Sequence, residues 1–112
     1  KLENLTVNLI SVFELQATAA KLGVPSKFVT EAADAILTTF RVEPFHKPEI
    51  VEISFELRKS IQDYIDCVIV ATAATLREDL ATEDTLVLAN RKQIKDRYGV
   101  NTMSYQDIAR IT

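Results

Sequence analysis

Cysteine, glycine and proline are all scarce in this sequence. The chain of 112 residues contains one cysteine, two glycines and three prolines. The single cysteine, Cys67, excludes a disulfide within the chain and is typical of a reducing compartment, so we expect a cytoplasmic protein. The scarcity of glycine and proline argues against long irregular segments.

Several other signals are missing. No apolar run approaches the length of a membrane span, and no secretory signal is visible. The sequence has no glycine-rich phosphate loop, no nucleophilic triad and no zinc-ligand spacing. The formal net charge of −3 does not indicate a nucleic-acid-binding protein, although a local basic patch remains compatible with one.

Short apolar runs alternate with amphipathic stretches along the whole chain, and hydrophobic residues make up 47% of it. The expected strands are 5–11, 40–45, 80–82 and 100–105. The expected helices are 12–22, 26–37 with Ser26 as its cap, 48–60, 63–77 and 84–98. This alternation predicts a three-layer α/β/α sandwich with a mostly parallel sheet, formed by residues 1–112 as one domain.

Acidic residues gather at the expected functional edge of this sheet, where the strands end. Glu14 follows the first predicted strand, Asp66 begins the most apolar helix, and Thr82 and Asp84 end the third strand. Carboxylates that share a low-dielectric site stay charged together when a cation lies among them. Oxygen ligands suit Mg²⁺ or Mn²⁺, and such a site suits phosphodiester hydrolysis.

Helix capping is the alternative interpretation of the same carboxylates. Asp63 is a candidate cap of the apolar helix, and Asp66 in the first turn is favoured by the helix dipole. Thr82 or Asp84 is a candidate cap of the next helix, and Glu14 near a helix start is unremarkable. The sequence leaves both interpretations open.

Three motifs together resemble those of the PIN domain family, which includes the VapC-type toxin ribonucleases. "ISVFEL" (10–15) is similar to the family's second motif, a strand that runs into an acidic residue. "DCVIVATA" (66–73) is similar to its Asp-x-x-Ile-x-Ala-x-Ala motif, and "ATED" (81–84) to its Thr-x-Asp motif. Each motif alone is weak, but their order and spacing fit over essentially the whole chain.

The resemblance implies a Mg²⁺- or Mn²⁺-dependent endoribonuclease, the toxin of a toxin–antitoxin pair. Glu14, Asp66 and Asp84 would be the catalytic acids that hold the metal, and Thr82 would orient a carboxylate or water through its hydroxyl. Asp63 would be an additional acid or, more readily, a helix cap. The implied partners are an RNA substrate, a cognate antitoxin and a second copy of the chain, with no membrane.

The sequence departs from the family pattern in two places. PIN domains begin with a central strand that carries the first catalytic aspartate, and this strand has no counterpart in the sequence. We therefore expect a strand from an N-terminal segment or a partner chain to lie between the strands that carry Glu14 and Thr82. In addition, "REDLATED" (77–84) supplies charges where the family often has glycine.

These departures keep two further hypotheses in view. One is a non-catalytic PIN-like scaffold or RNA-binding module, and the other is a generic α/β domain whose carboxylates are caps.

Three remaining features have simpler interpretations. His46 is expected at the surface, and Cys67 is expected in the core. A basic group on the last long helix is expected to meet either an RNA backbone or only solvent; its members are Arg91, Lys92, Lys95 and Arg97.

Overall fold

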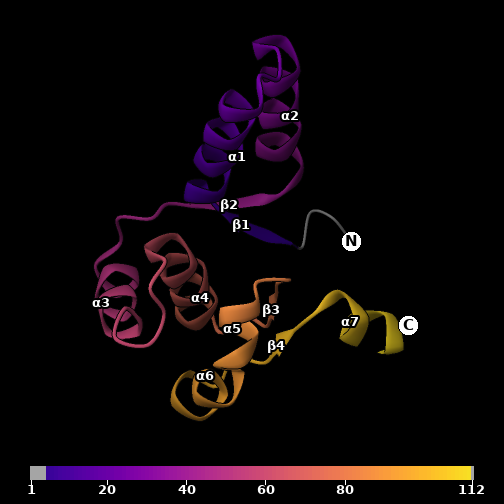
Figure 1. The fold of residues 1–112 in the computed structure, drawn as a ribbon. Helices are drawn as coiled ribbons and strands as arrows, with labels where there is room; N and C mark the ends of the chain where they lie inside the picture. Colours follow the sequence, from indigo (N-terminus) through magenta and orange to yellow (C-terminus); the bar gives the residue numbers. More distant parts are fainter. Residues whose placement is uncertain (1–4, 112) are drawn as a thin grey trace. The chain divides into compact units, whose positions relative to one another are not determined.

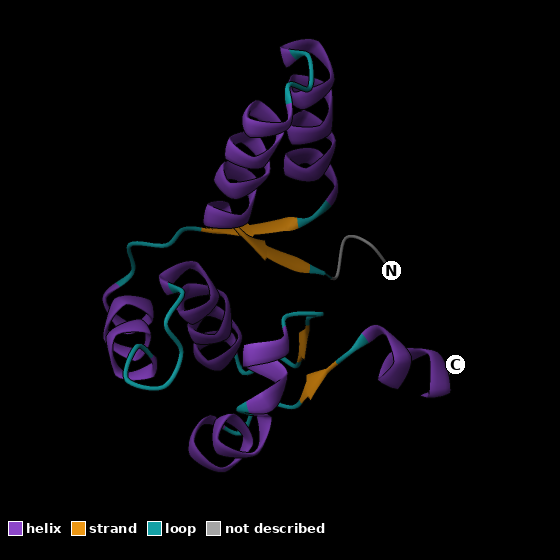
Figure 2. Ribbon diagram, viewed as in Figure 1, coloured by secondary structure: helices purple, strands orange, loops and turns teal. Residues whose placement is uncertain are grey.

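The computed structural model describes residues 5–111, which form helices and short parallel strands (Figures 1 and 2). The chain divides into two compact units, Lys1–His46 and Lys47–Thr112, which are called the first and second unit below. Each unit combines helices with one pair of parallel strands, so the chain is a mixed α/β protein, as its alternating pattern predicted. The prediction of a single domain over 1–112 stays a prediction.

The first unit consists of two helices that follow one strand and precede another. Its elements are β1 (Thr6–Asn8), α1 (Leu9–Leu22), α2 (Ser26–Thr39) and β2 (Arg41–Glu43). The strands β1 and β2 pair in parallel, with Val7 opposite Val42, and α1 and α2 pack side by side (Figure 1). Both strands were expected from the sequence, but the structure makes them shorter.

Asn8 explains why the first strand is short. Its side-chain Oδ1 accepts a hydrogen bond from the Ile10 amide at 2.9 Å, and its Nδ2 donates to the Pro44 carbonyl at 3.1 Å. Asn8 therefore caps α1, and the helix begins at Leu9 inside the predicted strand 5–11. The prediction of a strand through residue 11 was wrong because the cap was overlooked.

The ends of α1 and α2 show one correct and one wrong prediction. Gly23 closes α1 in the left-handed conformation, with φ of 75°, as its position in the sequence predicted. Ser26 does not cap α2: the cap position belongs to Pro25, and no side chain makes a capping hydrogen bond there. Helix α2 then ends at Phe40, whose extended backbone leads into β2.

The second unit contains the remaining elements. They are α3 (Pro48–Leu57), α4 (Tyr64–Leu76), β3 (Leu80–Ala81), α5 (Thr85–Ala89), α6 (Arg91–Tyr98), β4 (Thr102–Met103) and α7 (Tyr105–Ile111). Strands β3 and β4 pair in parallel, with Leu80 opposite Thr102. None of the helices that the structure describes is long and apolar enough to cross a membrane.

Helix α4 forms the centre of the second unit's core and packs against α3. Val70 and Ala71 on α4 are fully buried, as are Ile50 on α3 and Ile61 in the loop between the two helices. Cys67 is also buried, and its Sγ donates to the Ile61 carbonyl at 3.3 Å, which confirms the expected core position. Burial raises the pKa of the Cys67 thiol.

The C-terminal part of the second unit differs from the prediction in three ways. The expected helix over 84–98 is divided into α5 and α6 at Asn90, whose Nδ2 donates to the Leu86 carbonyl at 2.8 Å. The expected strand over 100–105 is limited to Thr102–Met103. Helix α7 was not predicted at all, and it starts directly after Ser104.

Candidate functional site

Asp66 lies in the first turn of α4, as the sequence predicted, and is half-buried there. The helix begins after Asp63, whose Oδ1 accepts a hydrogen bond from the Ile65 amide at 2.9 Å. This confirms Asp63 as the N-cap of α4. An acidic side chain in the first turn is favourable next to the positive end of the α4 dipole.

Thr82 and Asp84 lie together just beyond β3, also as predicted. The Thr82 Oγ1 accepts a hydrogen bond from the Asp84 amide at 3.1 Å, which makes a tight turn between the strand and α5. The Asp84 Oδ1 accepts from the Val87 amide at 2.9 Å, and Asp84 is the N-cap of α5. The hydroxyl of Thr82 therefore holds the backbone that positions the Asp84 carboxylate.

Only one of the two oxygens of the Asp84 carboxylate takes part in capping α5. The bond to Val87 uses Oδ1, and Oδ2 makes no hydrogen bond with the residues that the structure describes. A carboxylate has two oxygens with about four acceptor positions, so one oxygen can cap a helix while the other binds a ligand. The capping and metal interpretations of Asp84 are therefore compatible.

Glu14 lies in the first unit, on α1, with an exposed side chain. The sequence placed it directly after a strand, whereas the structure places it in the second turn of a helix that begins at Leu9. Asp66, Thr82 and Asp84 all belong to the second unit. Within residues 5–111, no three histidine, cysteine, aspartate or glutamate side chains come together as a metal-binding group.

The donor chemistry of the second unit nevertheless suits a hard divalent cation. Mg²⁺ is commonly held by one or two carboxylates and completes its shell with water. Asp84 has an oxygen free for such a bond, and Asp66 is a second carboxylate at a helix N-terminus. The thiol of Cys67, which would favour softer metals, is buried and bonded to Ile61.

Two further acids near the end of β3 were missed by the sequence interpretation. Glu83 accepts a hydrogen bond through Oε2 from the Tyr105 amide. The Asp107 Oδ2 accepts from the Ser104 amide at 2.9 Å, and the Ser104 Oγ accepts from the Asp107 amide at 3.2 Å. This reciprocal pair is a capping box, and its Ser-x-x-Asp spacing was visible in the sequence.

The pKa of Asp107 is lowered, mainly by its backbone and side-chain hydrogen bonds with Ser104 and then by Arg91 and Arg110. Its carboxylate is thus kept charged by its own helix cap. Through Ser104 and Tyr105, α7 is attached to the turn that carries Glu83 and Asp84. At the edge beyond β3 and β4, the carboxylates of Glu83 and Asp107 accept hydrogen bonds from the successive backbone amides of Tyr105 and Ser104.

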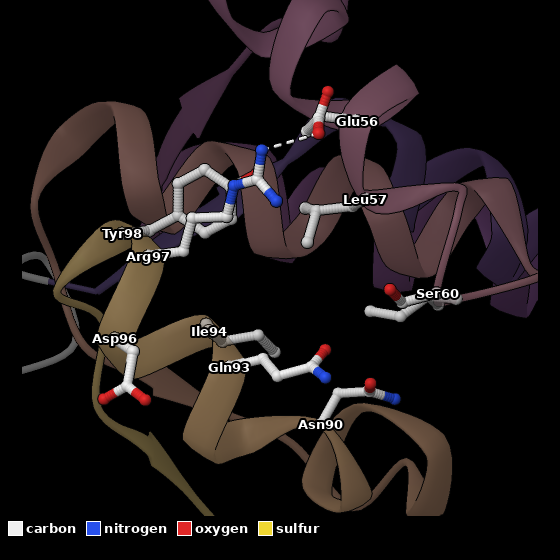
Figure 3. Close-up of a pocket in the computed structure, with 10 residues that line it drawn as sticks. Glu56, Leu57, Ser60, Asn90, Gln93, Ile94, Asp96, Arg97 and Tyr98 are labelled. Carbon is white, nitrogen blue, oxygen red and sulfur yellow. Dashed lines mark hydrogen bonds and ion pairs between the residues drawn. The ribbon is translucent and has the colours of Figure 1, made fainter.

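A separate cavity of about 430 Å³ lies between the end of α3 and α6, as Figure 3 shows. The Arg97 guanidinium lies 2.6 Å from the Glu56 carboxylate at its side, and Lys59 and Arg97 together lower the pKa of Glu56. Burial raises the pKa of Tyr98. None of the acids predicted from the sequence lines this cavity, so it is not the predicted site.

Comparisons with family models, with curated proteins and with solved structures gave no match.

Proposed function

We propose that this chain is a PIN-type endoribonuclease that depends on Mg²⁺ or Mn²⁺. The observation that carries the proposal is the pairing of its strands. In a PIN sheet the strands that lead to Glu14 and Thr82 are not neighbours, because a central strand lies between them. Within residues 5–111, β1 pairs with β2 in the first unit and β3 pairs with β4 in the second, as the two outer pairs of such a sheet would.

This pairing supports a three-layer α/β/α sandwich completed by one additional parallel strand between β1 and β3. Parallel sheets as small as two short strands are rarely stable by themselves, and a strand edge left open is a template for pairing. The end of the additional strand carries the remaining aspartate of the metal site.

In the proposed site, Asp66 and Asp84 bind the cation, and Glu14 contributes directly or through water. The bound cation would polarise the scissile phosphate and supply an activated water. Thr82 fixes the backbone of Asp84 through its 3.1 Å hydrogen bond, and Asp84 retains Oδ2 for binding while Oδ1 caps α5. The substrate would be single-stranded or looped RNA lying along the edge beyond β3.

The first unit supports an extension of the proposal to protein partners. Its helices leave large apolar side chains exposed, including Phe13 at 61%, Leu22 at 74% and Phe28 at 57%. Two largely apolar hollows of about 380 and 520 Å³ lie on the same unit. Burying this surface against a cognate antitoxin or a second copy of the chain would stabilise it. In this proposal the protein is a cytoplasmic toxin.

A non-catalytic PIN-like scaffold or RNA-binding module is the second candidate. It is favoured by the hydrogen bonds of Asp63 and Asp84, which both cap helices. Caps alone account for the presence of these two aspartates, and a chain that uses them only as caps would bind RNA without cleaving it.

Cleavage of a fluorescent single-stranded RNA with and without Mg²⁺ or Mn²⁺ tests the proposal. The wild type should cleave only with metal, and Asp84→Asn, which keeps a capping oxygen, should abolish cleavage. Glu49→Gln is the control, since Glu49 is an exposed acid on α3 that has no part in the proposed site. Metal-independent cleavage, or equal activity of Asp84→Asn and wild type, would reject the nuclease.

A further inference from the structure

A basic hollow of about 490 Å³ lies on the second unit, between α6, β4 and the start of α7. Arg91, Lys92 and Lys95 line it from α6, and Asp107 lines it from α7. Positions i, i+1 and i+4 of a helix fall on one side, so the three cationic side chains share one face of α6. The hollow is therefore a concentrated positive site on a chain whose net charge is −3.

The acids around the hollow do not neutralise it fully. The Arg91 Nη1 lies 3.3 Å from the Asp107 Oδ2, and the Lys92 Nζ lies 3.2 Å from the Asp96 Oδ2. The Lys95 ammonium forms no ion pair within the part of the chain that the structure describes. Three cations thus face two carboxylates, and the Lys92 side chain is 89% exposed, so its charge remains available to a ligand.

Thr102 on β4 also lines the hollow and is 8% exposed. Its Oγ1 is buried, so this oxygen does not contribute to the accessible surface of the hollow. The hollow therefore attracts a ligand through the positive charge of its lysine and arginine side chains.

The hollow adjoins the acidic edge through a short series of hydrogen bonds. Asp107, which pairs with Arg91, accepts the Ser104 amide at 2.9 Å. The next residue, Tyr105, donates its amide to Glu83, which precedes Asp84 in the sequence. One strand of nucleic acid could therefore meet the cations and the proposed metal site in succession.

We propose that the basic hollow binds the phosphate backbone of the RNA strand to one side of the scissile bond. This inference rests on the proposed ribonuclease function. Lysine and arginine side chains supply most contacts of proteins with the phosphates of nucleic acids, and these contacts position a strand without reading its sequence. The hollow is thus a positioning site, whereas Asp66 and Asp84 remain the proposed catalytic acids.

Binding of a fluorescent single-stranded RNA in EDTA, where the metal-dependent reaction cannot proceed, tests the inference. Lys95→Gln should raise the Kd at least about threefold at low salt, and Lys92→Gln with Lys95→Gln should raise it further. The slope of log Kd against log salt should fall by about 0.7 for each phosphate that the variant no longer neutralises. Lys95→Arg keeps the charge and should restore binding.

Arg97→Gln is the matched control, because it removes one positive charge from the same helix outside the hollow, beside Glu56 (Figure 3). An equal loss of affinity in Arg97→Gln and Lys95→Gln would show a general charge effect and overturn the inference. Unchanged binding in the double variant would overturn it as well. Inorganic phosphate should displace RNA from the wild type more strongly than chloride at equal ionic strength, and this excess should be lost in the double variant. The same excess in both proteins would overturn the inference.

The outcomes also separate this inference from the proposed function. If the wild type cleaves RNA with Mg²⁺ and the double variant binds RNA as the wild type does, the inference about the hollow is wrong but the proposed nuclease function stands. If the double variant loses RNA binding and the wild type does not cleave RNA, the hollow is supported as an RNA-binding site. The non-catalytic RNA-binding module is then favoured over the nuclease.

Discussion

The two units of this chain differ in how much of their apolar surface they bury. In the first unit, the buried side chains among the described residues are those of Asn8, Val12 and Ala19. Helix α2 buries none, although its sequence has a regular apolar stripe. The second unit instead has a continuous core that includes Ile50, Val70 and Ile94.

This difference concerns how each unit of the chain is stabilised. The second unit, which carries Asp66 and Asp84, has the apolar packing to hold its acids in place. The first unit is too small and too exposed for its helices to be stabilised by burial within that unit. We therefore expect its stability to depend on whatever covers α1 and α2.

The largest expected loss of stability comes from shortening a buried side chain in the core of the second unit. Ile50→Ala removes a side chain with 0% exposure and should lower the free energy of unfolding by about 2–5 kcal/mol. Leu37→Ala in the first unit, at 44% exposure, should change it by less than about 1 kcal/mol. Urea unfolding measures both, and equal losses would contradict the comparison.

The next effect concerns the side chain of Asn8 in the first unit. Asn8→Ala removes a helix cap together with the bond to Pro44 and should cost about 2 kcal/mol. Asn8→Asp keeps the capping oxygen and loses only the donor, so it should cost less. If thermal unfolding gives Asn8→Ala and wild type the same stability, β1 and its cap do not hold the first unit together.

A smaller effect is expected at Asp84 in the second unit. Asp84→Ala removes the cap of α5 and should cost about 1 kcal/mol in metal-free buffer, whereas Asp84→Asn should retain most of the stability. Added Mn²⁺ should raise the Tm of the wild type but not that of Asp84→Asn. A Tm that Mn²⁺ leaves unchanged in both proteins would indicate that Asp84 is only a cap.

The smallest effect depends on pH. The pKa of Asp107 is lowered from 3.8 in the folded protein, so its ionised form stabilises the fold above that value. This contribution is lost as the pH falls from 3.8 through the lowered folded pKa. Asp107→Asn should therefore reduce stability slightly at neutral pH and flatten its acid dependence. Identical pH profiles of the two proteins, measured by urea unfolding, would refute this assignment.

The sequence was most informative where a local signal and burial agree. The apolar run with Asp63 in front predicted α4 and its cap, and Gly23 and Gly99 both end helices in the left-handed conformation. Periodicity of the α2 stripe predicted the helix correctly, but it also suggested a buried face. Burial depends on neighbours elsewhere, which periodicity does not supply.

Most errors arose where polar side chains compete with regular structure. Asn8 ended a strand early, and Asn90 divided a helix by bonding the Leu86 carbonyl, a competition typical of asparagine. Of the candidate acids, Asp66 and Asp84 lie where the sequence predicted. Glu14 lies further into its helix, because its position was inferred from the wrong strand boundary.

Calorimetric titration with Mn²⁺ tests the central claim that Asp66 and Asp84 together bind a divalent cation. The wild type should bind Mn²⁺, and Asp66→Asn should weaken that binding at least about tenfold, because a ligand is removed. Asp63→Asn, which changes the neighbouring cap by the same chemistry, should bind as the wild type does. Equal affinities of the wild type and Asp66→Asn, or no binding by either, would contradict the account.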